Sequence, residues 1–409
     1  MKRVVISGLG VISPLGLTLK ETWPNVLAGN SGVTRISSFD PSRLPVQIAA
    51  EVKGFNPETV MDAKEARRTT RFIQLAVAAA KEALSDAGID TARESERIGC
   101  SIGVGIGAIE FIHDTVVSLS KDGPRRISPF FIPFSITNMA AGMVANTFNL
   151  KGPNLCSATA CASGTHAIGE AFLFIKNNMA DMMVCGGSES AICEVAVGGF
   201  ANMKALSRNN EQPQLASRPF DRNRDGFVMG EGSGILVLEE YEHAKARGAH
   251  IYAELLGFGM SGDAYHISSP PPEGEGAQRC MTAALRSAGV NPEQIAYINA
   301  HGTSTLINDI YESEAILKVF GSAASRLMIS STKGVTGHCL GAAGGIEAVF
   351  LAKAIAASTV PPTANLEEVD PKCTLDYVPR HARALKINYG MSNSFGFGGT
   401  NASLVMCNV

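Results

Sequence analysis

An internal match between two segments constrains the fold of this chain more than any other feature of its sequence. TACASGTHAIGEAFLFIK (159–176) aligns without gaps with TGHCLGAAGGIEAVFLAK (336–353), at a constant offset of 177 residues. A second pair of similar segments, KEALSDAGID (81–90) and TAALRSAGVN (282–291), precedes the first pair in the same order. Self-similarity of this kind indicates a duplicated structural unit. We therefore predict two related halves, residues 1–250 and 251–409.

Short apolar runs alternate along the chain with segments of helical periodicity. RVVISGLG, MMVCGGSE and ASLVMC are typical of buried strands, whereas FIQLAVAAAKEALSDAG has apolar residues at helical spacing and ends in glycine. Such alternation predicts an α/β fold. The 45% of apolar residues and 18% of charged residues require a large buried interior.

Several classes of protein are disfavoured by the composition. A net charge of −3 argues against general nucleic-acid binding. The nine cysteines lack a C-x-x-C spacing, which favours a reduced, intracellular protein without a zinc or redox site. The N-terminal apolar run is short and broken by glycines, so we expect no signal peptide. We find no apolar run of about 18 residues and expect no membrane span.

Cys161 is the strongest candidate for a nucleophile. Small residues surround it, and a helix is predicted to begin at this point. A helix N-terminus lowers the pKa of a thiol and favours the thiolate, while a free backbone N–H there can stabilise an oxyanion. Cys156, in the approach to this segment, is interpreted as a packing residue.

Two histidines follow predicted strands in glycine-rich surroundings. NAHGTST contains His301, and STKGVTGHCLGAAGG contains His338. In the internal alignment, Cys161 corresponds to His338, so a thiol and an imidazole would meet where the halves join. Lys333, five residues before His338, either orients this site, with Glu347 as a partner, or is a solvated surface lysine. The segments NSFGFGGTNA (393–402) and GVGIGAIE (103–110) match no nucleotide-binding fingerprint.

These motifs resemble the β-ketoacyl-[acyl carrier protein] synthases, condensing enzymes of the thiolase fold. TACASG, NAHGTST, STKGVTGH and NSFGFGGTN occur in the order typical of that family, and the resemblance covers essentially the whole chain. It is closest to the type II elongating synthases of dissociated fatty acid synthesis. One departure is Leu306, where the family commonly has proline after HGTST. The resemblance implies two α/β halves stacked in α-β-α-β-α layers.

The resemblance also implies roles for individual residues. Cys161 would accept the acyl chain, and His301 and His338 would bind the malonyl thioester oxygen. Lys333 would hold the charge network with Glu347. The remaining site residues are the oxyanion hole made by the N–H groups of Cys161 and Phe397, the gate at Phe397 beside Phe395, the acyl-pocket residue Ile106, the tunnel residue Phe200, and the pantetheine-tunnel residues Thr303, Thr305, Ser268 and Ser269.

Partners are likewise implied by the resemblance. We expect acyl- and malonyl-loaded acyl carrier protein, a homodimer, a cytoplasmic location, and neither a metal nor an organic cofactor. Since the carrier is acidic in this family, a local basic patch is expected. Its candidates are Lys64, Arg67, Arg68, Arg71, Arg125, Arg126, Lys204 and Arg208, each of which could instead be an ordinary solvated charge.

Other functions remain open at this point. A thiolase would use coenzyme A and normally carries a second catalytic cysteine, and the type III synthases use Cys-His-Asn. A type I synthase or a polyketide ketosynthase would carry similar motifs. A non-catalytic chain-length factor would lack the nucleophile that Cys161 supplies. The sequence does not encode the preferred acyl chain length in a readable way.

Overall fold

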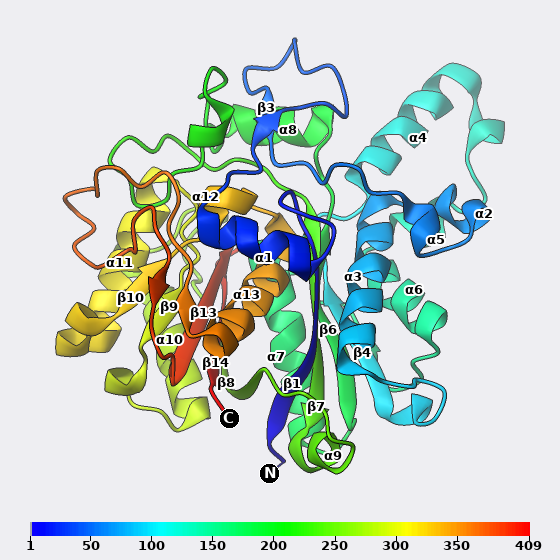
Figure 1. The fold of residues 1–409 in the computed structure, drawn as a ribbon. Coiled ribbons are helices and arrows are strands. Elements are labelled where there is room, and N and C mark those ends of the chain that lie inside the picture. Colours follow the sequence, from blue (N-terminus) through cyan, green and yellow to red (C-terminus); the bar gives the residue numbers. More distant parts are fainter. Residues whose placement is uncertain (1) are drawn as a thin grey trace.

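Two five-stranded halves with the same strand order form the framework of the molecule (Figure 1). The computed structural model describes residues 2–409. In each half the first two strand pairs are antiparallel and the last two are parallel. The first half has the order β1 (Val4–Ile12), β7 (Gly232–Glu240), β6 (Met182–Glu189), β4 (Ile98–Gly103) and β5 (Asn154–Leu155). The second has the order β8 (Ala253–Gly262), β14 (Thr400–Cys407), β13 (Tyr389–Gly396), β9 (Tyr297–Asn299) and β10 (Met328–Ser330).

The halves join into one ten-stranded sheet through antiparallel pairing of Val4–Ile6 with Ala253–Leu255. Two short ribbons lie outside this sheet: β2 (Thr34–Arg35) pairs with β3 (Ile48–Ala49), and β11 (Thr359–Val360) pairs with β12 (Arg383–Ala384). The predicted division at residues 250 and 251 stays a prediction.

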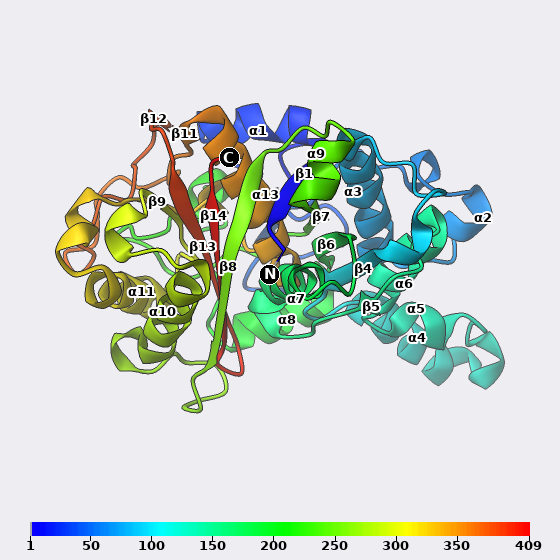
Figure 2. The same ribbon diagram turned by 90° about the horizontal axis from the view of Figure 1, so that it is seen from below.

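Helices fill the layers between and outside the half-sheets (Figure 2). The central layer is made of α7 (Ser163–Lys176) and α13 (Ala343–Ala357). One outer layer holds α3 (Arg71–Ala87) and α6 (Met139–Phe148), and the other holds α10 (Glu275–Ala288) and α11 (Leu306–Phe320). The remaining helices are α1 (Leu19–Ala28), α2 (Ala63–Ala66), α4 (Ile109–Asp122), α5 (Phe131–Ser135), α8 (Glu194–Asn202), α9 (Tyr241–Ala246) and α12 (Lys333–Thr336).

Three apolar cores occupy the spaces between these layers. One surrounds α7 and α13, one lies under α3 and α6, and one lies under α10 and α11. The predicted α/β class and the α-β-α-β-α layering are therefore confirmed. The strands predicted from apolar runs are also present, whereas β8, which carries three glycines and polar residues, has no such run.

The second internal match corresponds to equivalent helix ends. α3 and α10 stop at Gly88 and Gly289, which adopt left-handed backbone conformations with φ of 63° and 66°. A residue with a Cβ is disfavoured in this conformation, so glycine is the usual stop signal. The sequence repeat thus reflects the same helix terminus in each half.

The first internal match aligns the two segments in a register that differs by three residues from their structural equivalence. Each central helix follows a single 3₁₀ turn, Ala160–Ala162 before α7 and Leu340–Ala342 before α13. Each turn begins with a non-glycine residue at positive φ, Ala160 at 50° and Leu340 at 47°. The structural offset is therefore 180 residues, and Gly341, not His338, is the counterpart of Cys161. The ungapped alignment was wrong here because alanine and glycine match in many registers.

Glycines allow the two central helices to approach closely at their N-terminal ends. A Cβ on Gly164 would lie 2.7 Å from the backbone nitrogen of Gly345. A Cβ on Gly344 would lie 2.1 Å from Thr165 Oγ1 and 2.6 Å from the Thr165 backbone nitrogen. These two contacts exchange under the offset of 180 residues, as a pseudo-twofold axis requires.

One segment corrects the expectation that no apolar run is long enough for a membrane. Leu340–Ala357 has the length and composition of a membrane span, but 83% of it is buried within the protein. It contains α13, whose position between the two half-sheets explains its uniformly apolar composition.

We predict that Gly344→Ala lowers the free energy of unfolding by about 1–3 kcal/mol, because the added methyl group meets backbone atoms of Thr165. Gly199→Ala is the control, since an added Cβ there has no atom within 4 Å and Gly199 lies within α8. That change should raise stability by about 0.5–1 kcal/mol. Urea unfolding followed by circular dichroism measures both, and equal effects of the two changes would contradict the packing argument.

Candidate active site

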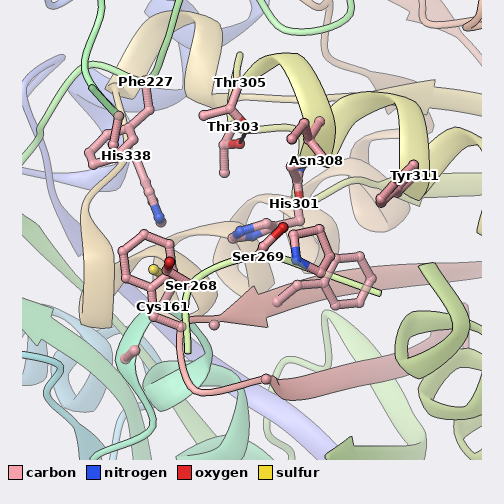
Figure 3. A pocket seen from close by; sticks show the side chains of 18 of the residues that line it. Cys161, Phe227, Ser268, Ser269, His301, Thr303, Thr305, Asn308, Tyr311 and His338 are labelled. Atoms are coloured by element: carbon pink, nitrogen blue, oxygen red, sulfur yellow. Dashed lines mark hydrogen bonds between the residues drawn. The ribbon is translucent and has the colours of Figure 1, made fainter. Parts of the chain in front are cut away.

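A cavity of about 570 Å³ opens at the place where the two halves meet. Figure 3 shows the side chains of Cys161, His301 and His338 directed toward one another in it. The structure thus brings together the predicted nucleophile and both predicted histidines. The other predicted site residues that line the cavity are Ile106, Phe200, Lys204, Ser268, Ser269, Thr303, Thr305, Phe395 and Phe397.

Cys161 lies in the 3₁₀ turn immediately before α7, so the predicted helix start is in the right place. Its side chain is buried, with 8% of the residue exposed to the cavity. Burial raises the pKa of Cys161 to about 12, while the charge of Lys333 and the backbone N–H groups of Phe397 and Cys161 act to lower it. This direction is opposite to the lowered pKa that the sequence predicted, because desolvation outweighs Lys333 and the two backbone N–H groups.

The two imidazoles lie almost perpendicular to each other, with ring centroids 5.4 Å apart. Their Nδ1 atoms are buried and have no hydrogen-bond partner. Burial, the positive charge of Lys333 and, for His301, the neighbouring His338 hold both pKa values well below the usual range of histidine. Since a protonated Nδ1 would be a buried donor without an acceptor, the Nε2–H tautomer is favoured.

Lys333 is one of the largest fully buried side chains of the protein, and the alternative of a solvated lysine is wrong. Its Nζ donates to Glu347 Oε1 and, over 2.5 Å, to the carbonyl oxygen of His301. Lys333 does not line the cavity, so it acts on the site through the backbone of His301 and through its charge. Burial raises the pKa of Glu347 to about 7, although Lys333 opposes this rise.

The glycine-rich segment 393–402 is mostly strand and only partly loop. β13 extends to Gly396 and β14 begins at Thr400, which leaves Phe397–Gly399 as the turn. Gly398 and Gly399 have φ of 83° and 71°, a conformation that favours glycine. Phe397 is 38% exposed, and its ring centroid lies 6.4 Å from that of Phe200. Phe395 lies deeper, 5.6 Å from the His301 ring.

Two threonines follow His301 along one wall (Figure 3). Thr303 Oγ1 and Thr305 Oγ1 are 2.9 Å apart, and Thr305 is the residue before α11. Leu306, the departure from the family pattern, begins α11 and is 58% exposed. Proline is favoured at the first position of a helix but is not required there, so α11 begins at Leu306 without a proline.

The basic candidates fall into three groups. Lys204 is exposed at the cavity, and Arg208 is exposed four residues further on. Arg71 forms an ion pair with Glu231 over 2.8 Å and is removed from the set of free surface charges. The other five are exposed and lie outside the cavity, on α2, directly after it, or in the turn between α4 and α5: Lys64, Arg67, Arg68, Arg125 and Arg126.

Sequence reasoning missed three residues that shape the site. Glu312 is fully buried and accepts the backbone N–H groups of His301 and Gly302 over 2.8 and 2.7 Å. Phe227 packs with its ring centroid 5.3 Å from that of His338. Tyr311 lines the cavity from α11. Nothing in the sequence marked Glu312, because an acidic residue within a helix is usually solvated. Among residues 2–409, no group of three or more His, Cys, Asp or Glu side chains is placed to hold a metal ion.

Comparison with known proteins agrees with this geometry. The family model described as "Beta-ketoacyl synthase, N-terminal domain" matches residues 1–244, and the one described as "Beta-ketoacyl synthase, C-terminal domain" matches residues 252–367. The chain belongs to the beta-ketoacyl synthase family. The resemblance read from its motifs is therefore confirmed.

Members of this family are similar to the chain over its whole length. A Coxiella burnetii protein named 3-oxoacyl-[acyl-carrier-protein] synthase 2 is 53% identical, covering 100% of this chain and 99% of that protein. A beta-ketoacyl synthase structure from Burkholderia phymatum has a TM-score of 0.93 at 38% identity and covers all of both chains. A type II polyketide ketosynthase, solved in complex with its acyl carrier protein, has a TM-score of 0.93 at 36% identity, covering 100% of this chain and 99% of that one.

We predict that His301 and His338 stay neutral as the pH falls from about 8 to about 5.5, because burial and Lys333 hold their pKa values well below the usual value of about 6.5 for histidine. Nitrogen chemical shifts of ¹⁵N-labelled histidine, assigned with His301→Ala and His338→Ala, report the protonation state directly. A titration midpoint near pH 6.5 for either imidazole would contradict the buried environment described above.

Proposed function

We propose that this chain is a 3-oxoacyl-[acyl carrier protein] synthase of the second type, which elongates fatty acyl chains by two carbons. The observation that carries the proposal is the convergence of one thiol and two neutral imidazoles in a single cavity. The 53% identity to a synthase 2, against 36% to a polyketide ketosynthase, favours fatty acids over polyketides. The alternative of a type I synthase or a polyketide ketosynthase is not favoured.

The first half-reaction transfers an acyl chain to Cys161. Its sulfur forms a bond to the acyl carbon, the thioester bond to the carrier breaks, and the thiol proton ends on the released carrier thiol. The high pKa of Cys161 means that the thiol is protonated at rest and loses its proton only as the acyl group arrives. In this proposal the backbone N–H groups of Cys161 and Phe397 stabilise the oxyanion of the tetrahedral intermediate.

The second half-reaction uses the histidines. The malonyl carboxylate leaves as carbon dioxide, and the electron pair of the broken C–C bond forms an enolate. Its oxygen accepts hydrogen bonds from Nε2–H of His301 and His338, which requires neutral imidazoles. The enolate carbon then attacks the acyl-Cys161 carbonyl and displaces the sulfur, which takes up a proton from water to restore the thiol. Lys333, held by Glu347 and the carbonyl oxygen of His301, fixes one imidazole in position without touching substrate.

The remaining cavity residues receive substrate-binding roles. In this proposal the pantetheine arm passes Thr303, Thr305, Ser268 and Ser269. Ile106 and Phe200, which line the same cavity as Cys161, bound the acyl chain. Phe397, on a turn with two glycines in left-handed conformations, is suited to act as the gate, with Phe395 behind it. The proposed reaction needs no metal and no organic cofactor.

We infer that acyl carrier protein delivers both substrates. The similar ketosynthase that was solved with its acyl carrier protein supports this partner. Lys204 and Arg208 are candidates for contacts near the cavity, and Lys64, Arg67, Arg68, Arg125 and Arg126 form a second basic group around α2. Arg68 also stacks on Phe130, with 4.5 Å between guanidinium carbon and ring centroid, which joins α2 to the segment before α5.

A homodimer is part of the proposal. The helix α4 has no buried residue, and Ile112, Val116 and Leu119 lie exposed on one of its faces. Ile132 and Ile136, from the neighbouring α5 region, are 64% and 44% exposed. The edge strand β5, at the end of the sheet, is also exposed. An apolar face beside an open sheet edge fits a second copy of the chain related by a twofold axis.

We place the reaction in the cytoplasm. All nine cysteines are free thiols, eight of them buried, which suits a reducing compartment.

We predict that Cys161→Ala abolishes condensation while the protein stays folded, because the acyl acceptor is gone. Cys161→Gln should also stop condensation but leave malonyl decarboxylation, since both histidines remain. Mass spectrometry of the carrier-bound products, with circular dichroism as the folding control, distinguishes these outcomes. Retained elongation in the Cys161→Ala protein would reject the assignment of the nucleophile.

We predict that Val116→Glu dissociates the dimer, because it buries a charge in the apolar face of α4. Met179→Glu is the matched control, since Val116 and Met179 are each 54% exposed and Met179 lies away from α4. Sedimentation velocity measures the oligomeric state. A monomeric parent protein, or a Val116→Glu protein that remains dimeric, would refute this choice of interface.

A further inference from the structure

A buried carboxylate beside the cavity has no part in the mechanism described above. Glu189 is the last residue of β6 and is completely buried. Its Oε2 accepts the backbone N–H groups of Gly105, Ile106 and Gly341 over 2.8, 3.0 and 3.1 Å. Its Oε1 accepts the N–H of Gly107 over 2.7 Å. Four backbone donors thus converge on one side chain.

These donors come from two different walls of the cavity. Gly105–Gly107 form the loop that carries Ile106, and Gly341 lies in the turn between His338 and α13. The nucleophile turn is close as well, because a Cβ on Gly105 would lie 3.2 Å from the carbonyl oxygen of Ala160. The same added Cβ would lie 2.7 Å from Glu189 Oε2. Glu189 therefore lies where three segments meet: the loop that carries Ile106, the turn before α7 that carries Cys161, and the turn between His338 and α13.

The Ile106 loop depends on this carboxylate for its backbone hydrogen bonds. Every backbone N–H from Gly105 to Gly107 donates to Glu189. All four partners of Glu189 are donors, so the ionised carboxylate, which is an acceptor on both oxygens, satisfies them and a neutral amide cannot. A glutamine of the same size would present an NH₂ group to backbone N–H groups and leave at least one of them unpaired.

We propose that Glu189 is a positioning residue that holds the Ile106 wall against Cys161 and thereby limits the length of the acyl chain. The inference rests on the proposed function, in which Ile106 bounds the acyl pocket. Ile106 is only half-buried and lines the cavity, so its own packing leaves it free to shift when the backbone hydrogen bonds are lost. Loosening the loop should therefore enlarge the pocket and favour longer chains.

The test compares kcat/KM for tetradecanoyl and hexanoyl carrier protein in the full-length enzyme. We expect Glu189→Gln to raise the ratio of the long to the short substrate by about threefold or more. The ratio is measured within one preparation, so a loss of folded protein does not alter it. If Glu189→Gln is insoluble, the same ratio of kcat/KM values measured for Gly105→Ala tests the proposal, because the added Cβ would displace the same carboxylate oxygen.

Two further variants separate the possible failures. Glu51→Gln is the matched control: Glu51 is also a buried carboxylate that accepts backbone N–H groups, from Ser37 and Ser38, but neither of these donors lines the cavity. Its ratio should equal that of the parent protein. Ile106→Phe should lower the ratio, because the larger side chain shortens the pocket. If Ile106→Phe leaves the ratio unchanged, the pocket role of Ile106 in the proposed function fails. If Ile106→Phe lowers it but Glu189→Gln matches Glu51→Gln, the role of Glu189 is overturned.

Discussion

The close approach of α7 and α13 at their N-terminal ends organises the rest of the molecule. Gly164 and Gly344 carry no side chain at this contact, so each lies close to the backbone of the other helix, at Gly345 and Thr165. The two 3₁₀ turns that precede the helices are thereby held together, and they carry Cys161 and Gly341. Because His338 lies three residues before Gly341, the packing of two helices also fixes the distance between a thiol and an imidazole. A wider helix separation would open the cavity and separate these groups.

Burial at this junction determines the electrostatics of the site. Desolvation raises the pKa of the Cys161 thiol and lowers the pKa of His301 and His338, so all three groups are neutral at rest. Charged groups are buried behind them, at Lys333 with Glu347 and at Glu189 among backbone donors. Neutral reactive groups in front of fixed charges suit a reaction that forms an enolate and then consumes it, since the protein rearranges little as charge develops.

Much of the site could be predicted because local signals mark it. The small residues around Cys161, the glycine-rich surroundings of His301 and the motif that contains His338 each identified a residue that lines the cavity. Glu312 and Glu189 could not be predicted, since each acts through backbone N–H groups that come from other parts of the chain. The apparent alignment of Cys161 with His338 led to the expected convergence, although the true counterpart of Cys161 is Gly341.

The amino-acid sequence alone is sufficient to predict the α/β class, the duplication, the helix ends at Gly88 and Gly289, and the identity of the reactive side chains. These properties depend on residue type and spacing along one segment. Three further properties follow from the folded arrangement: the register of the duplication, the protonation states of the thiol and the imidazoles, and the burial of Lys333. Those properties depend on how far each group is desolvated and on which distant segment packs against it. Neither can be predicted from the local sequence.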